Sequence, residues 1–308
     1  MIKYIFRRLI ALIPVLIGVA FIVFTLLYIT PGDPARMALG DQAPQSAVEE
    51  FRERRGLNDP FIIQFGNYVV RAVQGDLGNS YVTKGPVFTD IKAAFPNTFK
   101  LTVFSITIAV LLGIPFGIIS AIKQYSIFDT VVMVFAMIGL SMPVFWLGLL
   151  LILLFSVRLR WFPASGFDTF RSMVLPSLSL AAQSVSIVTR MTRSSMLEVI
   201  RQDYIRTARA KGQTESKIIW RHALPNALIP VVTIVGLQFG GLLGGAILTE
   251  TIFAVPGVGQ LMVNAIKQRD YPMVQGGVLF VAVTFSLVNL LVDLLYAFID
   301  PRIKAEYK

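Results

Sequence analysis

Six long runs of apolar residues constrain the fold of this chain more than any other feature. A helix of about 20 mostly apolar residues spans the hydrocarbon core of a bilayer, so each run predicts one transmembrane helix. Charged residues make up only 15% of the chain, whereas soluble domains carry roughly 25%. The sequence therefore predicts an all-α integral membrane protein with six transmembrane helices, at Leu9–Ile29, Leu101–Ile122, Thr130–Val157, Met173–Thr189, Ala227–Leu248 and Gly276–Ile299.

Lys and Arg residues in the connections predict the orientation of these helices. The short connections 123–128 and 190–225 and the N-terminal segment 1–8 are richer in cations than the short connections 158–172 and 250–275. Cytoplasmic loops carry such an excess, so both termini are expected in the cytoplasm. The cations flank apolar runs and form no separate basic face, which argues against nucleic acid as a partner and for contact with membrane lipid.

Two long connections divide the chain. Residues 1–100 would hold the first helix and an extracytoplasmic subdomain, in which Gln45–Arg54 reads as an amphipathic helix that stops at Gly56. Residues 101–299 would form a five-helix core whose cytoplasmic loop is 190–225, and residues 300–308 a cytoplasmic tail. In the outer segment 250–275 we expect a short helix across the outer mouth.

The cytoplasmic loop has the pattern of two helices joined by a sharp turn. Met196, Ile200, Tyr204 and Ala208 are spaced four apart, which predicts one apolar stripe on one helix. Gly212 would end that helix with a positive φ, and Gln213–Ala223 would form a second short helix that ends at Leu224-Pro225. The alternative is a solvated basic loop with no partner.

The loop sequence also resembles a known family. DYIRTARAKG (residues 203–212) and HALPNALIP (residues 222–230) are similar to the ATPase-coupling loop of permeases in binding-protein-dependent ABC importers. Other short matches point to the first permease of the peptide/nickel branch. They are PGDP (31–34), GDLG (75–78), MTRSSMLEV (191–199), ILTETIF (247–253), PGVG (256–259), RDYP (269–272) and DPRI (300–303).

This resemblance implies a fold, partners and coupling residues. The fold would be that of a type I ABC importer permease in the plasma (inner) membrane of a prokaryote. The partners would be a second homologous permease, two cytosolic ATPase subunits that bind ATP and Mg, and an extracytoplasmic substrate-binding protein. The coupling residues would be Asp203, Tyr204, Arg206, Thr207, Ala208, Gly212, Leu224 and Pro225. Arg206-Thr207-Ala208 stands where the wider family has Glu-Ala-Ala, so Arg206 is our candidate for the glutamate's polar contact.

The residues themselves predict neither a catalytic nor a metal site. No Gly-Lys dipeptide occurs, so the chain has no Walker phosphate-binding loop. It has no Cys and one His, His222, which cannot make a zinc site alone. We therefore expect a transport subunit without a cofactor of its own and without ATPase activity.

Polar residues inside the apolar runs are the candidates for a translocation path, because polar atoms in spans face protein or water. The candidates are Ser179, Gln183, Ser186, Gln238, Asn289 and Asp293. The alternative for the serines is close helix packing. For the glycines between Gly236 and Gly245 we expect close helix packing, and the alternative is that they let a gate helix flex. The alternative for Asp293 is an ion pair with Arg190 or Arg193. Pro115 and Pro143 are expected to kink their helices.

The function that these features favour is a permease subunit of an ATP-driven peptide importer. Within the same class, the substrate would instead be nickel, glutathione or another small solute. Two other classes stay open, namely a secondary transporter or channel that uses Asp293 as its coupling acid, and a membrane scaffold that transports nothing.

Overall fold

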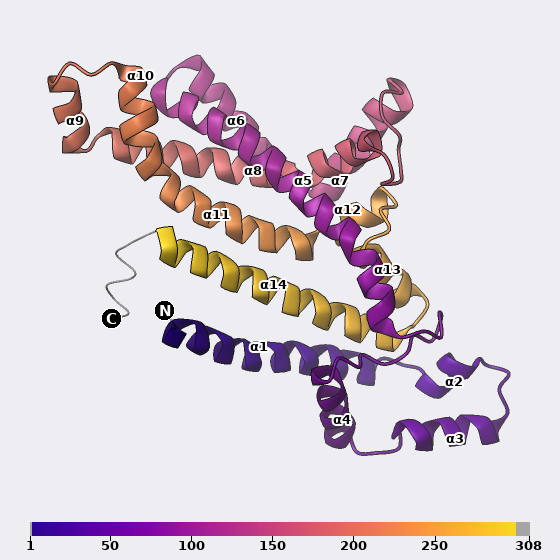
Figure 1. Cartoon of the computed structure of the whole chain (residues 1–308). Coiled ribbons are helices and arrows are strands. Elements are labelled where there is room, and N and C mark those ends of the chain that lie inside the picture. Colours follow the sequence, from indigo (N-terminus) through magenta and orange to yellow (C-terminus); the bar gives the residue numbers. More distant parts are fainter. Residues whose placement is uncertain (1, 300–308) are drawn as a thin grey trace.

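A computed structural model describes the backbone of residues 2–299 and the side chains of residues 6–294. The described chain is a bundle of long helices with small helical units at its two ends (Figure 1). The bundle consists of α1 (Ile2–Ile29), α5 (Val87–Ile122), α6 (Ile127–Ser141), α7 (Val144–Leu151), α8 (Phe170–Ile200), α11 (Leu224–Gly245) and α14 (Tyr271–Ile299). The tail 300–308 and its DPRI segment lie outside the described residues.

The six predicted membrane crossings are present as five long helices and one broken pair. Four long apolar helices are α1, α5, α8 and α14, and the fifth runs from Glu215 to Gly245. The pair Ile127–Ser141 and Val144–Arg158 passes the same length and composition test but is bent by 106°. The apolar run Thr130–Val157 is therefore not one straight helix.

Pro143 explains where the third crossing breaks. The residue before a proline is pushed out of the helical region, and Met142 is extended, with ψ 128°. The chain restarts as α7 directly after Pro143 and continues as a π-helical stretch, η1 (Ile152–Arg158). In contrast, α5 continues without a break through Pro115.

A close crossing of α5 and α8 lies at the centre of the bundle. A Cβ at Gly117 would lie 2.7 Å from the Thr189 carbonyl oxygen, and one at Gly113 would lie 2.8 Å from Val188 Cγ1. These two glycines are four residues apart, so they lie on one face of α5 and let the two backbones approach. The sequence reading did not single out this Gly-x-x-x-Gly pair.

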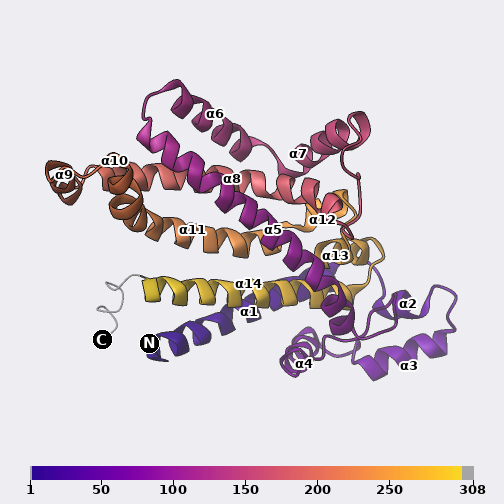
Figure 2. The ribbon, with the colours of Figure 1, turned by 45° about the horizontal axis from the view of Figure 1, so that its top comes forward.

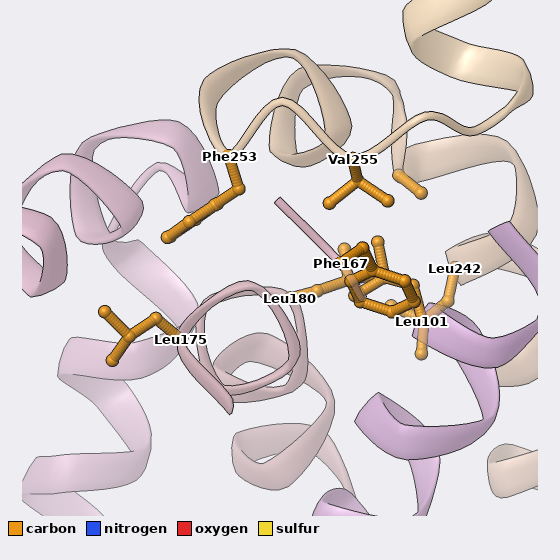
Figure 3. Packing of buried hydrophobic residues seen from close by; sticks show 8 residues of the cluster. Leu101, Phe167, Leu175, Leu180, Leu242, Phe253 and Val255 are labelled. Atoms are coloured by element: carbon orange, nitrogen blue, oxygen red, sulfur yellow. The ribbon is translucent and has the colours of Figure 1, made fainter. Parts of the chain in front are cut away.

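The main hydrophobic cluster joins the bundle to the segments beyond it. Leu101 of α5, Leu180 of α8 and Leu242 of α11 pack with Phe167 and Val255 (Figure 3). Phe253 belongs to the same cluster, and its carbonyl oxygen accepts a hydrogen bond from the Gly166 amide at 2.9 Å. The connection between α7 and α8 is thereby fixed to the segment after α11.

The two ends of the bundle carry different units. The start of α1, the end of α14 and the helices α9 (Asp203–Ala210) and α10 (Glu215–Lys217) lie at one end in both views (Figures 1 and 2). The other end carries α2 (Pro34–Leu39), α3 (Gln45–Arg55), α4 (Phe61–Val73), α12 (Ile247–Ile252) and α13 (Val258–Lys267). This agrees with the expected grouping of the termini with the loop 190–225.

The unit of α2, α3 and α4 is attached through aromatic residues. Phe24 of α1 packs with Phe61, Phe65 and Tyr68 of α4. The helix expected at Gln45–Arg54 is confirmed as α3, although Val48 is its only buried residue, and Gly56 ends it with φ +66°. The predicted domain boundary at residue 100 falls inside α5, which begins at Val87, and the division stays a prediction.

Candidate functional site

Gly212 forms the elbow of the loop that follows α8. Its φ is +72°, which L side chains rarely adopt. The Gln213 amide donates to the Ala208 carbonyl oxygen at 3.3 Å, and the Gly212 amide donates to the Arg209 carbonyl oxygen at 2.9 Å. This pair of bonds is the Schellman pattern that ends a helix at a left-handed residue. The expected elbow at Gly212 is confirmed.

Buried side chains fix the elbow to the bundle. Ile205 of α9 and Ile218 after α10 are fully buried in one cluster with Met196 of α8 and Ile118 of α5. An ion pair between Arg209 and Glu215 closes the elbow, with Nε and Oε1 2.7 Å apart. The same cluster includes Ala227 of α11, so both arms of the elbow pack against α5, α8 and α11.

The predicted apolar stripe is wrong in one respect. Met196 and Ile200 belong to α8, which runs to Ile200, whereas Tyr204 and Ala208 belong to α9. The break at residues 201–202 shifts the register, so Ile205 is the buried residue of α9 and Tyr204 is exposed. Tyr204 still contacts the bundle, because its hydroxyl accepts a hydrogen bond from the Asn226 amide nitrogen at 2.9 Å.

The expected stop at Leu224-Pro225 is also wrong. The second arm continues as a π-helical stretch, η2 (Ile218–Ala223), directly into α11. Pro225 occupies the first turn of α11, where a missing amide hydrogen is tolerated, and the wider π turn precedes it. The second arm is therefore continuous with a membrane-spanning helix.

The outward side of α9 is polar and free of the bundle. The side chain of Arg206 is 73% exposed, and its nearest carboxylate is Asp203, 3.5 Å away on the same helix turn. Thr207 is also exposed, and its hydroxyl donates to the Asp203 carbonyl oxygen. Trp220, which the sequence reading missed, exposes a large indole on the second arm.

The polar residues of α8 lie against the broken helix pair. The Ser179 hydroxyl donates to the Val144 carbonyl oxygen at 3.0 Å. Ser186 packs so closely on α6 that a Cβ added at Gly139 would lie 2.5 Å from the Ser186 hydroxyl oxygen. Both serines are buried, whereas Gln183 between them is exposed. The two serines therefore contact α7 and α6, and of the three residues only Gln183 has an exposed side chain.

The polar residues of α11 and α14 face neighbouring helices. Gln238 donates to the Ser184 hydroxyl on α8 at 3.0 Å. Asn289 packs beside α11, because a Cβ added at Gly240 would lie 3.1 Å from Asn289 Oδ1. This oxygen has no hydrogen-bond partner within the described residues. Gly236 likewise approaches Val292 of α14. These glycines pack two helices together, while Gly241 and Gly245 have nothing within 4 Å.

Asp293 does not pair with Arg190 or Arg193, the two cations that we expected as its partners. Its carboxylate lies 3.0 Å from Nη1 of Arg8 at the start of α1. Arg193 instead pairs with Asp129 at the start of α6, with its Nε and Nη2 2.7 and 2.8 Å from the two carboxylate oxygens. Asp129 is buried and also accepts a hydrogen bond from Ser120. Two ion pairs therefore clamp helices at the end of the bundle that carries the elbow.

At the opposite end, Glu250 organises the turn between α12 and α13. Its carboxylate is fully buried and accepts hydrogen bonds from the Thr98 hydroxyl at 2.6 Å and the Gln260 amide at 3.1 Å. Burial raises the pKa of Glu250 above its usual value. The short helix expected in this segment is confirmed as α13, and the PGVG turn before it wraps around Glu250.

Comparisons with known proteins identify the family. Residues 113–305 match the binding-protein-dependent transport system inner membrane component, and residues 1–102 match the N-terminal part of the same membrane components. A dipeptide transport system permease protein, DppB of Alkalihalophilus pseudofirmus, is 46% identical over 99% of this chain and 100% of that protein. A glutathione transport system permease protein, GsiC of Pectobacterium atrosepticum, is 47% identical over 99% of both chains.

Solved structures agree on the fold. A chain of the inward-facing MetNI methionine ABC transporter aligns with a TM-score of 0.57 and 21% identity over 68% of this chain and 96% of that chain. This likeness supports the type I importer fold that the sequence predicts. The chain belongs to the family of binding-protein-dependent transport system inner membrane components.

Proposed function

We propose that the chain is one permease subunit of an ATP-driven importer of short peptides. The observation that carries this proposal is the similarity, over nearly the whole chain, to a dipeptide permease and to glutathione permeases. Glutathione is itself a peptide, so both kinds of relative favour one substrate class. The proposed partners are a second homologous permease, two ATPase subunits and a substrate-binding protein.

The elbow at Gly212 would receive the force of the ATPases. Its first arm presents Arg206 and Thr207 to a partner, and its second arm is continuous with α11. Movement of a docked partner would be transmitted to the bundle as a rigid displacement, since Ile205 and Ile218 are buried against it. The bundle would then rock between two states that open to opposite sides.

The side of the membrane follows from charge. The start of α1, the end of α14 and the elbow lie at one end of the bundle (Figure 1). The cations of the short connections favour the cytoplasm for this end. The unit of α2, α3 and α4 would then face the binding protein.

We propose Gln183, Gln238 and Asn289 as the residues that contact the path of the substrate. Gln183 is exposed, Gln238 is partly exposed, and Asn289 offers an oxygen without a partner in the described part of the chain. Ser179 and Ser186 would reach the path only if α6 and α7 moved away from α8. Asp293 is a weaker candidate, because Arg8 already neutralises it.

Transport by the complete complex in liposomes tests the proposal. Labelled alanyl-alanine, glutathione and Ni²⁺ would each be offered with the binding protein and ATP on opposite sides of the membrane. We expect ATP-dependent movement of at least one of the two peptides, and none with ATPase subunits that lack the Walker lysine. Transport driven by a proton gradient without ATP, and abolished by Asp293→Asn, would instead establish a secondary transporter.

A further inference from the structure

A cavity of about 420 Å³ lies at the end of the bundle opposite the elbow. It is lined by the last turns of α1, by α3 and α4, and by the first residues of α14, and it opens to the surface. Cavities of this size hold small organic ligands in many proteins. The proposed function above turns this end of the bundle toward the binding protein but assigns the cavity no ligand.

Three segments that are far apart in the sequence build one wall of the cavity. They are residues 32–34, residues 76–78 and residues 271–272. The buried carboxylate of Asp270 joins the last two of these segments, because it lies next to residue 271 and accepts hydrogen bonds from the Ser80 hydroxyl and from the Tyr81 amide at 3.0 Å. This part of the wall is thus fixed by a buried acid that does not itself line the cavity.

Two of the three arginines that line the cavity have no carboxylate partner among the described residues. Arg52 is neutralised by Asp33, at 2.9 Å. Arg55 and Arg71 also line the cavity, and neither forms an ion pair within residues 6–294. Arg55 lies over the ring of Phe51, and Arg71 donates only to the Asn67 carbonyl oxygen of its own helix. Two guanidinium groups therefore retain donors for an anion.

Other polar groups add a second kind of contact. The Tyr271 hydroxyl is buried, lines the cavity and has no hydrogen-bond partner in the described structure. Asp76 uses one carboxylate oxygen to accept from the Gly78 amide at 2.9 Å, which leaves the other for a cation. Phe24 and Leu27 supply an apolar surface. The cavity therefore offers sites for an anion, for a cation and for an apolar group.

We propose that this cavity binds a small zwitterion of about dipeptide size, with its carboxylate on Arg55 and Arg71 and its ammonium group near Asp76. Guanidinium groups bind carboxylates through paired, charge-assisted hydrogen bonds. A carboxylate fits this site better than a phosphate group, because Asp33 and Asp76 also line it and would repel a dianion. The site belongs to the permease itself and is separate from that of a binding protein.

Binding to the purified permease pair in lipid nanodiscs tests this inference without ATP or ATPases, so its outcome is independent of transport. The probe is labelled alanyl-phenylalanine, measured by equilibrium dialysis, with the same dipeptide amidated at its C-terminus as the comparison. We expect saturable binding that the amide weakens at least about tenfold. Absence of saturable binding at millimolar concentrations would overturn the proposal.

Substitutions locate the bound dipeptide. Arg71→Gln and Arg55→Gln should each weaken binding about tenfold. Arg54→Gln is the matched control, because Arg54 is adjacent on α3, is paired with Glu50 and does not line the cavity. Unchanged binding in both cavity variants would place the dipeptide elsewhere and overturn the proposal.

A chemical readout guards against misfolded variants and identifies other occupants. The chain has no native cysteine, so a single Asn67→Cys in the cavity wall can be labelled with a charged thiol reagent. We expect the dipeptide to slow labelling in the Arg54→Gln background, and we expect about tenfold more dipeptide to be needed for the same protection in the Arg71→Gln background. Protection by inorganic phosphate or by ligand-free binding protein, without protection by the dipeptide, would assign the cavity to those partners and refute the zwitterion site.

Discussion

Replacing Gly212 tests the elbow with little interference from packing. Its φ is +72°, and no atom lies within 4 Å of the position that a Cβ would occupy. A side chain therefore fits in space, and its cost comes from the backbone conformation alone. A left-handed backbone costs an ordinary residue about 1–2 kcal/mol, and Asn less. For a β-branched residue, the cost rises to about 3 kcal/mol.

The expected order of damage is Val, then Ala, then Asn. A cost of about 3 kcal/mol exceeds the combined stabilisation from the two hydrogen bonds that end α9, about 1 kcal/mol each, and from the exposed Arg209–Glu215 pair, less than about 1 kcal/mol, so the valine variant should relax out of this conformation. No bundle helix is altered, so membrane insertion should be unchanged. Peptide transport should fall sharply in Gly212→Val and stay near normal in Gly212→Asn.

The assay measures transport together with co-purification of the ATPase subunits. The matched control is Gly40→Val, because Gly40 has φ +92°, has the same open surroundings, ends α2 near the other end of the bundle and does not line the cavity. Gly56 is a poorer control, because a Cβ there would lie 2.7 Å from Asp59. Normal transport and normal ATPase binding in Gly212→Val would refute the elbow as the coupling element.

Three charged groups give further predictions. Asp129→Ala should lower the unfolding free energy by about 3 kcal/mol, because it strands the half-buried Arg193; an unchanged thermal midpoint of the purified permease pair would contradict this. Asp293→Asn should cost less than about 1 kcal/mol, since its pair with Arg8 is partly exposed, and ATP-driven transport should persist with the same pH profile. Burial raises the pKa of Glu250, so this group should make stability fall as pH rises above about 4.5. Glu250→Gln should make the thermal midpoint depend less on pH between pH 4 and 8. The same dependence on pH in the variant and in the parent protein would show that another group is responsible.

Local patterns predicted a large part of the fold. Apolar runs identified the membrane helices because their length is set by the bilayer. The end of α3 at Gly56 and the elbow at Gly212 were predictable because a positive φ favours glycine at a helix end. In each case, the signal lies within a few residues of the feature that it predicts.

Contacts between distant residues could not be predicted in the same way. Asp129 and Arg193 each read as a charge near a helix end, and only the packing of α6 on α8 makes them a pair. Asp293 is close to several cations in any bundle, and its choice of Arg8 depends on how α1 packs against α14. Pro143 marked the break in the third crossing, but the bend of 106° depends on how α7 packs against α8 and α12.

Photo-crosslinking at the elbow tests the central claim most directly. A benzophenone amino acid would replace Lys211, which is exposed beside Gly212, and in a second variant Val82, which is exposed near the other end of the bundle. In the active, complete complex, the account predicts covalent capture of an ATPase subunit from position 211 and none from position 82. Capture of the ATPase from position 82, or no capture from position 211 while transport continues, would contradict it.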